Sequence, residues 1–319
     1  MSSEIVPGVD TMALAERAWH GYGTVVGRNL TYNEALRTAG LEWSARLAPL
    51  TSITPNGVAE VDTHRATYRS DTGALLGVVG ADYRPHQPAE LLELARLTID
   101  ASADDGHVEV IGSLRGGRTV FITIALPGDV NIAGDVHVPR LVWVTSMDGT
   151  IATRAVATYV RAVCANTIRA SFRSARTSWA ARHTSSLAGR TDDARRALQL
   201  VWKVSDTFRA EVEELTRQAI TDTQADQVLT GLWPDQPGAT ARSRDAASRR
   251  RAEVRRMYRS DPRVAGWHGT AYGLVQAVST WELWDSPRRG ARGEQVLGAL
   301  FAGTRTRADH AAERLAALA

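Results

Sequence analysis

The sequence predicts an α+β fold, an antiparallel meander sheet of hairpins with packed helices, followed by a mostly helical C-terminal region. Three pairs of short β-like runs, each pair separated by turn residues, occupy the first half of the 319-residue chain. From Thr191 onward the pattern is that of amphipathic helices. We therefore expect an α+β core over residues 1–190 and a helical region over residues 191–319.

The three hairpins are predicted from their turns. Asp-Gly and Gly-Gly pairs tolerate the positive φ that tight hairpin turns require. Such pairs lie in residues 115–117 and 147–149, and Asp71-Thr72-Gly73 separates the first two runs. The flanking runs are rich in β-branched and aromatic residues, as strands are, and they cover residues 58–70 and 74–80, 107–114 and 118–126, and 140–146 and 150–160.

Helices are predicted between and after the hairpins. Residues 31–40 begin with Thr31 as N-cap and Glu34 at capping-box spacing, and they end at Gly40. Residues 88–102 begin with Pro88, which suits the first position of a helix. Apolar residues three and four apart predict further helices over residues 192–220, 246–260, 268–284 and 307–319.

Residues 233–245 are rich in Pro, Gly and Ser and predict a linker. Arginines follow closely, so we expect an Arg-rich linker around residues 234–259 within the helical region. Its cations are Arg242, Arg244, Arg249, Arg250, Arg251, Arg255, Arg256 and Arg259. Two interpretations stay open, a solvated linker and a basic arm that strengthens binding to an anion without selecting a sequence.

The two halves of the chain differ in charge. Residues 1–150 hold 11 Arg against 18 Asp and Glu, whereas the remaining residues hold 27 Lys and Arg against 17 Asp and Glu. Such a split indicates an anionic partner for the basic half, nucleic acid first. Cys164 is the sole cysteine, which excludes an internal disulfide. With no signal peptide or membrane-spanning pattern, we expect a cytoplasmic protein that does not bind membranes.

The basic half begins with a window that lacks acidic residues. Between Asp148 and Asp192 there are seven arginines and no Asp or Glu. We expect residues 162–183 to form a helix with an apolar stripe and a cationic stripe. The apolar stripe holds Cys164, Ile168, Phe172, Ala175 and Trp179, and the cationic stripe holds Arg169, Arg173, Arg176 and His183.

Two interpretations of this window were weighed. A solvated helix face is the ordinary one, but such faces interleave both signs of charge, and this window offers no carboxylate. A phosphate backbone would relieve the repulsion and release counterions. The predicted nucleic-acid-binding residues are Arg154, Arg161, Arg169, Arg173, Arg176 and Arg182.

Motifs for catalysis are missing from the sequence. The glycines of residues 112–118 lack the Lys of a phosphate-binding loop, and the eight histidines are scattered, which indicates structural or surface roles. We expect a protein without catalytic residues, metal or cofactor. A metal-dependent nuclease is a third hypothesis, disfavoured because the basic window has no carboxylate to hold an ion. The aromatic residues of "AWHGYGT" (18–24) suit either base stacking or core packing.

Seven sequence blocks carry a family resemblance: "AWHGYGT", "EALRTAGLEW", "RSDTGALLGVVGADYRPHQ", "GSLRGGRTVFITIALPGD", "TSMDGTIATRAVATYVRAVCANT", "RHTSS" and "GTAYGLVQAVSTWELWD". In this order they resemble the phage/plasmid-like protein family, a domain of unknown function numbered nine-three-two. The resemblance implies carriage by phages, prophages or plasmids, and it implies no activity. In outline, hairpins followed by a cationic helix are also similar to single-strand annealing recombinases of the RecT and Erf class, a likeness of fold only.

The leading hypothesis is a single-stranded nucleic-acid-binding protein that promotes strand annealing in phage or plasmid replication or recombination without ATP. The expected partners are single-stranded DNA, with RNA as an alternative, and further copies of the chain in a homo-oligomer. The runner-up is a non-enzymatic scaffold or host-interaction protein whose helical half binds protein.

Overall fold

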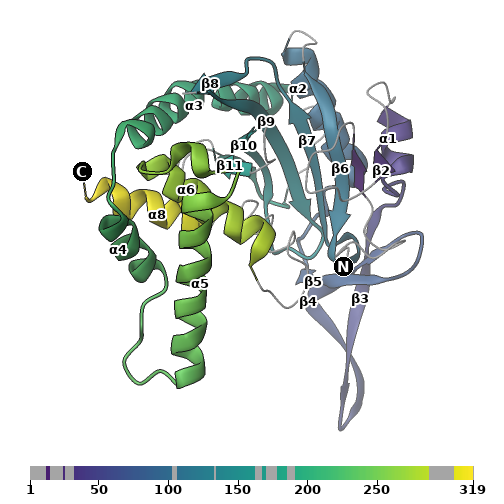
Figure 1. The fold of residues 1–319 in the computed structure, drawn as a ribbon. Helices are drawn as coiled ribbons and strands as arrows, with labels where there is room; N and C mark the ends of the chain where they lie inside the picture. The colour runs from purple at the N-terminus through teal and green to yellow at the C-terminus, as the bar shows by residue number, and fades with distance from the viewer. Residues whose placement is uncertain are drawn as a thin grey trace. The chain divides into compact units, whose positions relative to one another are not determined.

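The computed structural model describes residues 12–14, 24–25, 32–102, 106–132, 134–161, 167–169, 178–184, 191–286 and 305–318 (Figure 1). It forms two compact units. The first comprises residues 1–128, 139–158 and 178–201, and the second comprises residues 129–138, 159–177 and 202–319. The predicted division at residue 190 is a different one and stays a prediction.

The main sheet has nine strands, and its centre is the predicted meander. Strands β6 (His107–Leu114), β7 (Thr119–Ala125), β9 (Asp135–Ser146) and β10 (Thr153–Arg161) follow one another as antiparallel neighbours. The sheet is completed by the short strands β1 (Met12–Leu14), β2 (Thr24–Val25), β8 (Val130–Ile132), β11 (Thr167–Arg169) and β12 (Ser178–Ala181). The α+β class and the helical C-terminal region are confirmed.

The core lies against the middle of this sheet. Every residue of β7 is buried, and helix α2 (Pro88–Ala101) packs on β7 through Leu91, Leu92 and Ala95, among others. Trp143 of β9 is fully buried, and its indole N–H donates to Thr98 Oγ1 on α2 at 3.1 Å. Because this hydrogen bond replaces the one that water would make, burial of the indole N–H carries little cost. The apolar surface of the ring therefore stabilises the core.

The first predicted hairpin belongs to a separate three-stranded sheet. Strands β4 (Gly57–Arg69) and β5 (Leu75–Gly80) form that hairpin, and the unpredicted strand β3 (Ala45–Thr54) pairs with the other side of β4. Strand β3 was missed because Pro49 interrupts its pattern. The register of β3 against β4 shifts next to Pro49, and an edge strand tolerates this missing N–H donor.

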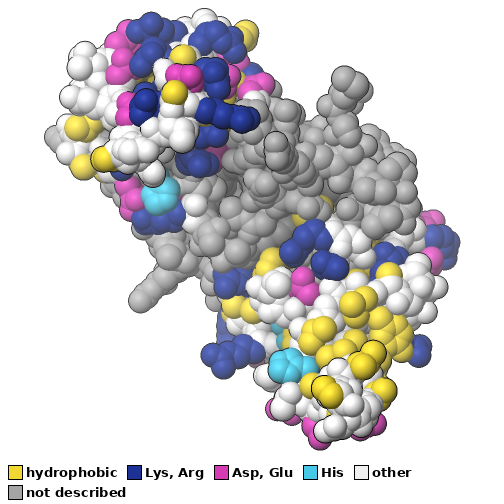
Figure 2. Space-filling model, turned by 90° about the horizontal axis from the view of Figure 1, so that it is seen from below, with side chains coloured by type: hydrophobic (Ala, Val, Ile, Leu, Met, Phe, Trp, Pro, Cys, Tyr) yellow, Lys and Arg dark blue, Asp and Glu magenta, His cyan; other side chains and the backbone are white. Residues whose placement is uncertain are grey.

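The three-stranded sheet exposes apolar side chains to solvent. The most exposed are Ile53 (92%) and Val58 (72%), which are partners across the end of the β3–β4 hairpin. Leu75 and Val78 of β5 are more than half exposed as well. Figure 2 shows hydrophobic side chains gathered at the lower right of the view. An exposed apolar patch of this kind indicates an interaction surface.

The second unit is mainly helical, as the sequence predicts. It holds most of α3 (Thr191–Arg217), and α4 (Asp222–Leu232), α5 (Ala241–Ser260), α6 (Ala271–Thr280) and α8 (Arg307–Ala316). All ten residues of α6 are buried, and a π-helical turn over Trp281–Asp285 continues it. The predicted helix over residues 31–40 is α1 (Tyr32–Thr38), which belongs to the first unit. Within the described residues, no helix is both long and apolar enough to cross a membrane.

Helix α5 occupies most of the region that was predicted to be an Arg-rich linker. Thr240 caps its first turn by accepting the backbone N–H of Ser243, and Val254, Met257 and Tyr258 give it a buried face. Three of its arginines pair with carboxylates that precede the helix, in the pairs Arg251–Asp235, Arg255–Asp226 and Arg259–Asp222. Ion pairs and a buried face together hold this Arg-rich segment as a helix rather than a linker.

Candidate functional site

The six predicted arginines lie at different places in the fold. Arg154 is on β10 and is partly buried, whereas Arg182 follows β12 and is exposed. Arg161 ends β10 and Arg169 ends β11, and the side chains of both lie outside the described residues. Arg173 and Arg176 also lie outside them. Among the predicted side chains that the structure describes, it brings together Arg154 and Arg182.

The helix predicted over residues 162–183 is wrong wherever the chain is described. Residues 167–169 form β11, and residues 178–181 form β12, which pairs antiparallel with β10. By pairing with β10, strand β12 supplies hydrogen-bond partners for backbone N–H and C=O groups that would be unpaired if this side of β10 were a sheet edge. Trp179 lies opposite Ala155 and packs edge-to-face on Trp143 with ring centroids 5.6 Å apart. These contacts with the sheet make the segment a strand, although its apolar residues recur at helical spacing.

Arg154 and Arg182 lie on one face of the β10–β12 ladder. Arg154 is paired with Ala180, and side chains two residues apart on a strand share a face, which places Arg182 diagonally next to Arg154. Arg182 makes no hydrogen bond or ion pair with any residue that the structure describes. Its guanidinium is therefore available to an anion.

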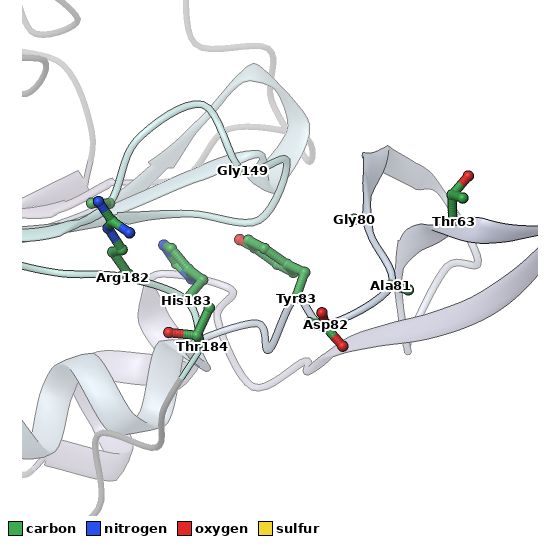
Figure 3. A pocket seen from close by; sticks show the side chains of 10 residues that line it. Thr63, Gly80, Ala81, Asp82, Tyr83, Gly149, Arg182, His183 and Thr184 are labelled. Atoms are coloured by element: carbon green, nitrogen blue, oxygen red, sulfur yellow. The ribbon is translucent and has the colours of Figure 1, made fainter.

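Arg182 also lines a pocket of about 610 Å³ in the first unit (Figure 3). The lining residues are Thr63, Gly80, Ala81, Asp82, Tyr83, Gly149, Ala152, Arg182, His183 and Thr184. In Figure 3, Arg182 and Asp82 lie at opposite ends of the row formed by the rings of His183 and Tyr83. The lining of the pocket thus includes a cation and a carboxylate with two aromatic rings between them.

Three rings form a stack beside this pocket. His183 lies between Tyr83 and His86, with ring centroids 4.8 Å and 4.3 Å away and nearly parallel planes. His183 Nε2 lies 3.1 Å from the Ile151 carbonyl, which can only accept, so the proton is on Nε2. His86 Nδ1 is 2.6 Å from Thr153 Oγ1. The stack is therefore fixed by hydrogen bonds to the β9–β10 hairpin.

Burial sets the charge state of His183. Its side chain is only 6% exposed, and desolvation, together with the neighbouring His86, lowers its pKa from 6.5 to about 4. His183 is thus neutral at physiological pH, with a lone pair on Nδ1. No described residue donates to this buried nitrogen. Burial likewise raises the pKa of Tyr83, whose hydroxyl donates to the Ser146 carbonyl at 2.7 Å.

The ring stack is the part of the site that the sequence patterns did not predict. His86 and His183 were interpreted as scattered histidines, yet the fold brings them into contact. The residue types of positions 179–184 do not alternate between apolar and polar, so no local sequence signal marked this strand. Burial alternates from Trp179 to Thr184, with positions 181 and 183 buried and positions 180, 182 and 184 exposed, and this period of two is that of a strand. Within the described part of the chain, no three His, Cys, Asp or Glu side chains are placed to hold a metal ion.

Comparison with known proteins gives one match. A family model described as a domain of unknown function, DUF932, matches residues 75–319. This range includes most of the sequence blocks that resemble the family. No curated protein and no solved structure matches the chain.

Proposed function

The chain belongs to the DUF932 family, and we propose that it is a single-stranded nucleic-acid-binding protein that promotes strand annealing in phage or plasmid replication or recombination without ATP. The observation that carries the proposal is the shared ladder face of Arg154 and Arg182. Both come from the window that holds seven arginines and no carboxylate. A phosphate backbone would supply anions to such a cationic face.

In this mechanism the guanidinium groups hold the phosphate backbone, and the base edges stay free to find a complement. Each contact releases condensed counterions, so affinity falls as salt rises. No covalent step is needed. A homo-oligomer would extend the cationic surface along the strand.

The test is a fluorescence-anisotropy titration of labelled single- and double-stranded oligonucleotides at about 50 mM and about 200 mM salt. Arg182→Ala removes one phosphate contact and should reduce the slope of log affinity against log salt by about 0.7 for single strands. Arg46→Ala is the control, because Arg46 is equally exposed but lies on β3. Equal slopes for the two variants, or no binding at the lower salt, would refute the proposal.

The exposed apolar surface of the three-stranded sheet supports a second candidate, a non-enzymatic scaffold that binds protein. Ile53 and Val58 face solvent at the end of the β3–β4 hairpin, and the exposure of apolar side chains to water is unfavourable. A second copy of the chain is the partner to test first. If this surface assembles the protein, Ile53→Ser with Val58→Ser lowers the mass found by sedimentation velocity, whereas Arg182→Ala leaves it unchanged.

A further inference from the structure

We infer that the pocket beside Arg182 receives one unstacked base of the bound strand, and that it prefers guanine. The inference rests on the proposed function, since Arg182 would hold the phosphate next to that base. It adds a base preference that phosphate contacts alone do not give.

The pocket has the size and lining of a base-binding site. Its volume of about 610 Å³ falls within the range of small-molecule pockets. Gly80, Ala81, Gly149 and Ala152 form much of its wall, so little side-chain bulk fills it.

Two charged side chains of the pocket have no partner among the described residues, the Arg182 guanidinium and the Asp82 carboxylate. The Asp82 carboxylate is exposed and makes no hydrogen bond to any residue in the described ranges. The Tyr83 hydroxyl proton is already used on Ser146. A ligand edge that meets the Asp82 carboxylate must supply donors.

Guanine meets this requirement better than the other DNA bases. Its Watson–Crick edge has two adjacent donors, N1–H and the N2 amino group, which match the two oxygens of a carboxylate. Adenine, cytosine and thymine each place an acceptor next to their donor on that edge. Asp82 and Arg182 lie on either side of the rings of Tyr83 and His183, so Asp82 can meet the base while Arg182 meets the phosphate next to it (Figure 3).

The test compares the affinities of three labelled single strands that differ at one central position. The strands are an oligothymidylate, the same strand with one guanine, and the same strand with hypoxanthine, which lacks the N2 amino group. We expect the guanine strand to bind about tenfold more tightly than oligothymidylate, and hypoxanthine to lose most of this gain.

The deciding variant is Asp82→Asn, which replaces one acceptor oxygen with a donor. It should abolish the ratio of guanine to thymine affinity, whatever it does to the affinity for all strands. Glu60→Gln, an exposed acid of β4 outside the pocket, should preserve the ratio. Equal binding of the guanine and thymine strands, or a ratio unchanged in Asp82→Asn, overturns the inference and leaves the proposed function standing. Absence of binding to every strand overturns both.

Discussion

Acidification should destabilise the protein through His183. The folded state keeps this histidine neutral down to a pKa of about 4, whereas the unfolded chain protonates it near 6.5. Because the folded-state pKa is depressed, the stabilisation is fully present above pH 6.5 and is lost as pH falls toward 4. One proton over this interval corresponds to about 3 kcal/mol, of which about 2 kcal/mol is lost between pH 7 and pH 5.

The measurement is urea unfolding, followed by tryptophan fluorescence, of the wild type and of His183→Phe across this pH range. The variant keeps an aromatic ring in the stack but has no proton to bind. The free-energy difference between the two proteins should therefore shrink by about 2 kcal/mol from pH 7 to pH 5. His64→Phe, at an exposed position, is the control and should leave the pH dependence of the wild type intact. Parallel curves for the wild type and His183→Phe would refute the reasoning.

Three further predictions concern packing and charge. Gly77→Ala should lower the free energy of unfolding by about 1–3 kcal/mol, because the new Cβ would lie 2.6–2.9 Å from atoms of Asp148 in the β9–β10 turn. Gly80→Ala is the control, because no atom lies within 4 Å of a Cβ at position 80. Similar melting temperatures for the two variants would contradict this prediction. Trp143→Ala should lose about 3–5 kcal/mol in urea unfolding, and a loss under about 1 kcal/mol would argue against a well-packed core there. A double-mutant cycle of Arg255→Ala and Asp226→Ala should give a coupling energy of about 0.2–1 kcal/mol, and this coupling should weaken in high salt. Additive effects of the two substitutions would indicate that the ion pair does not stabilise the protein.

Part of the candidate site was predictable, and part depended on long-range pairing. The acid-free window identified Arg154 and Arg182, and the fold places them on one ladder face. The same window was expected to be helical because its apolar residues recur at helical spacing. That expectation failed at β12, where contact with β10 and Trp143 decides the conformation.

The Arg-rich segment gives a similar lesson about the helical unit. A helix was predicted over residues 246–260 and is confirmed as part of α5, but the many arginines also suggested a linker around residues 234–259. Helix α5 is held instead by Val254, Met257 and Tyr258 against the other helices, and by carboxylates of α4 and the following loop. Those carboxylates precede the helix in sequence, and only the fold brings them opposite its arginines.

The sequence by itself determined the features that depend on neighbouring residues: the Gly-containing turns of three hairpins, the starts of α1 and α2, and the charge difference between the two halves. The tertiary structure decided which strand pairs with β10, where β3 lies, and how Tyr83, His86 and His183 come to share one stack. The physical reason is that turns and helix caps are set by local dihedral angles and hydrogen bonds, whereas strand edges and ring contacts are completed by residues distant in the chain.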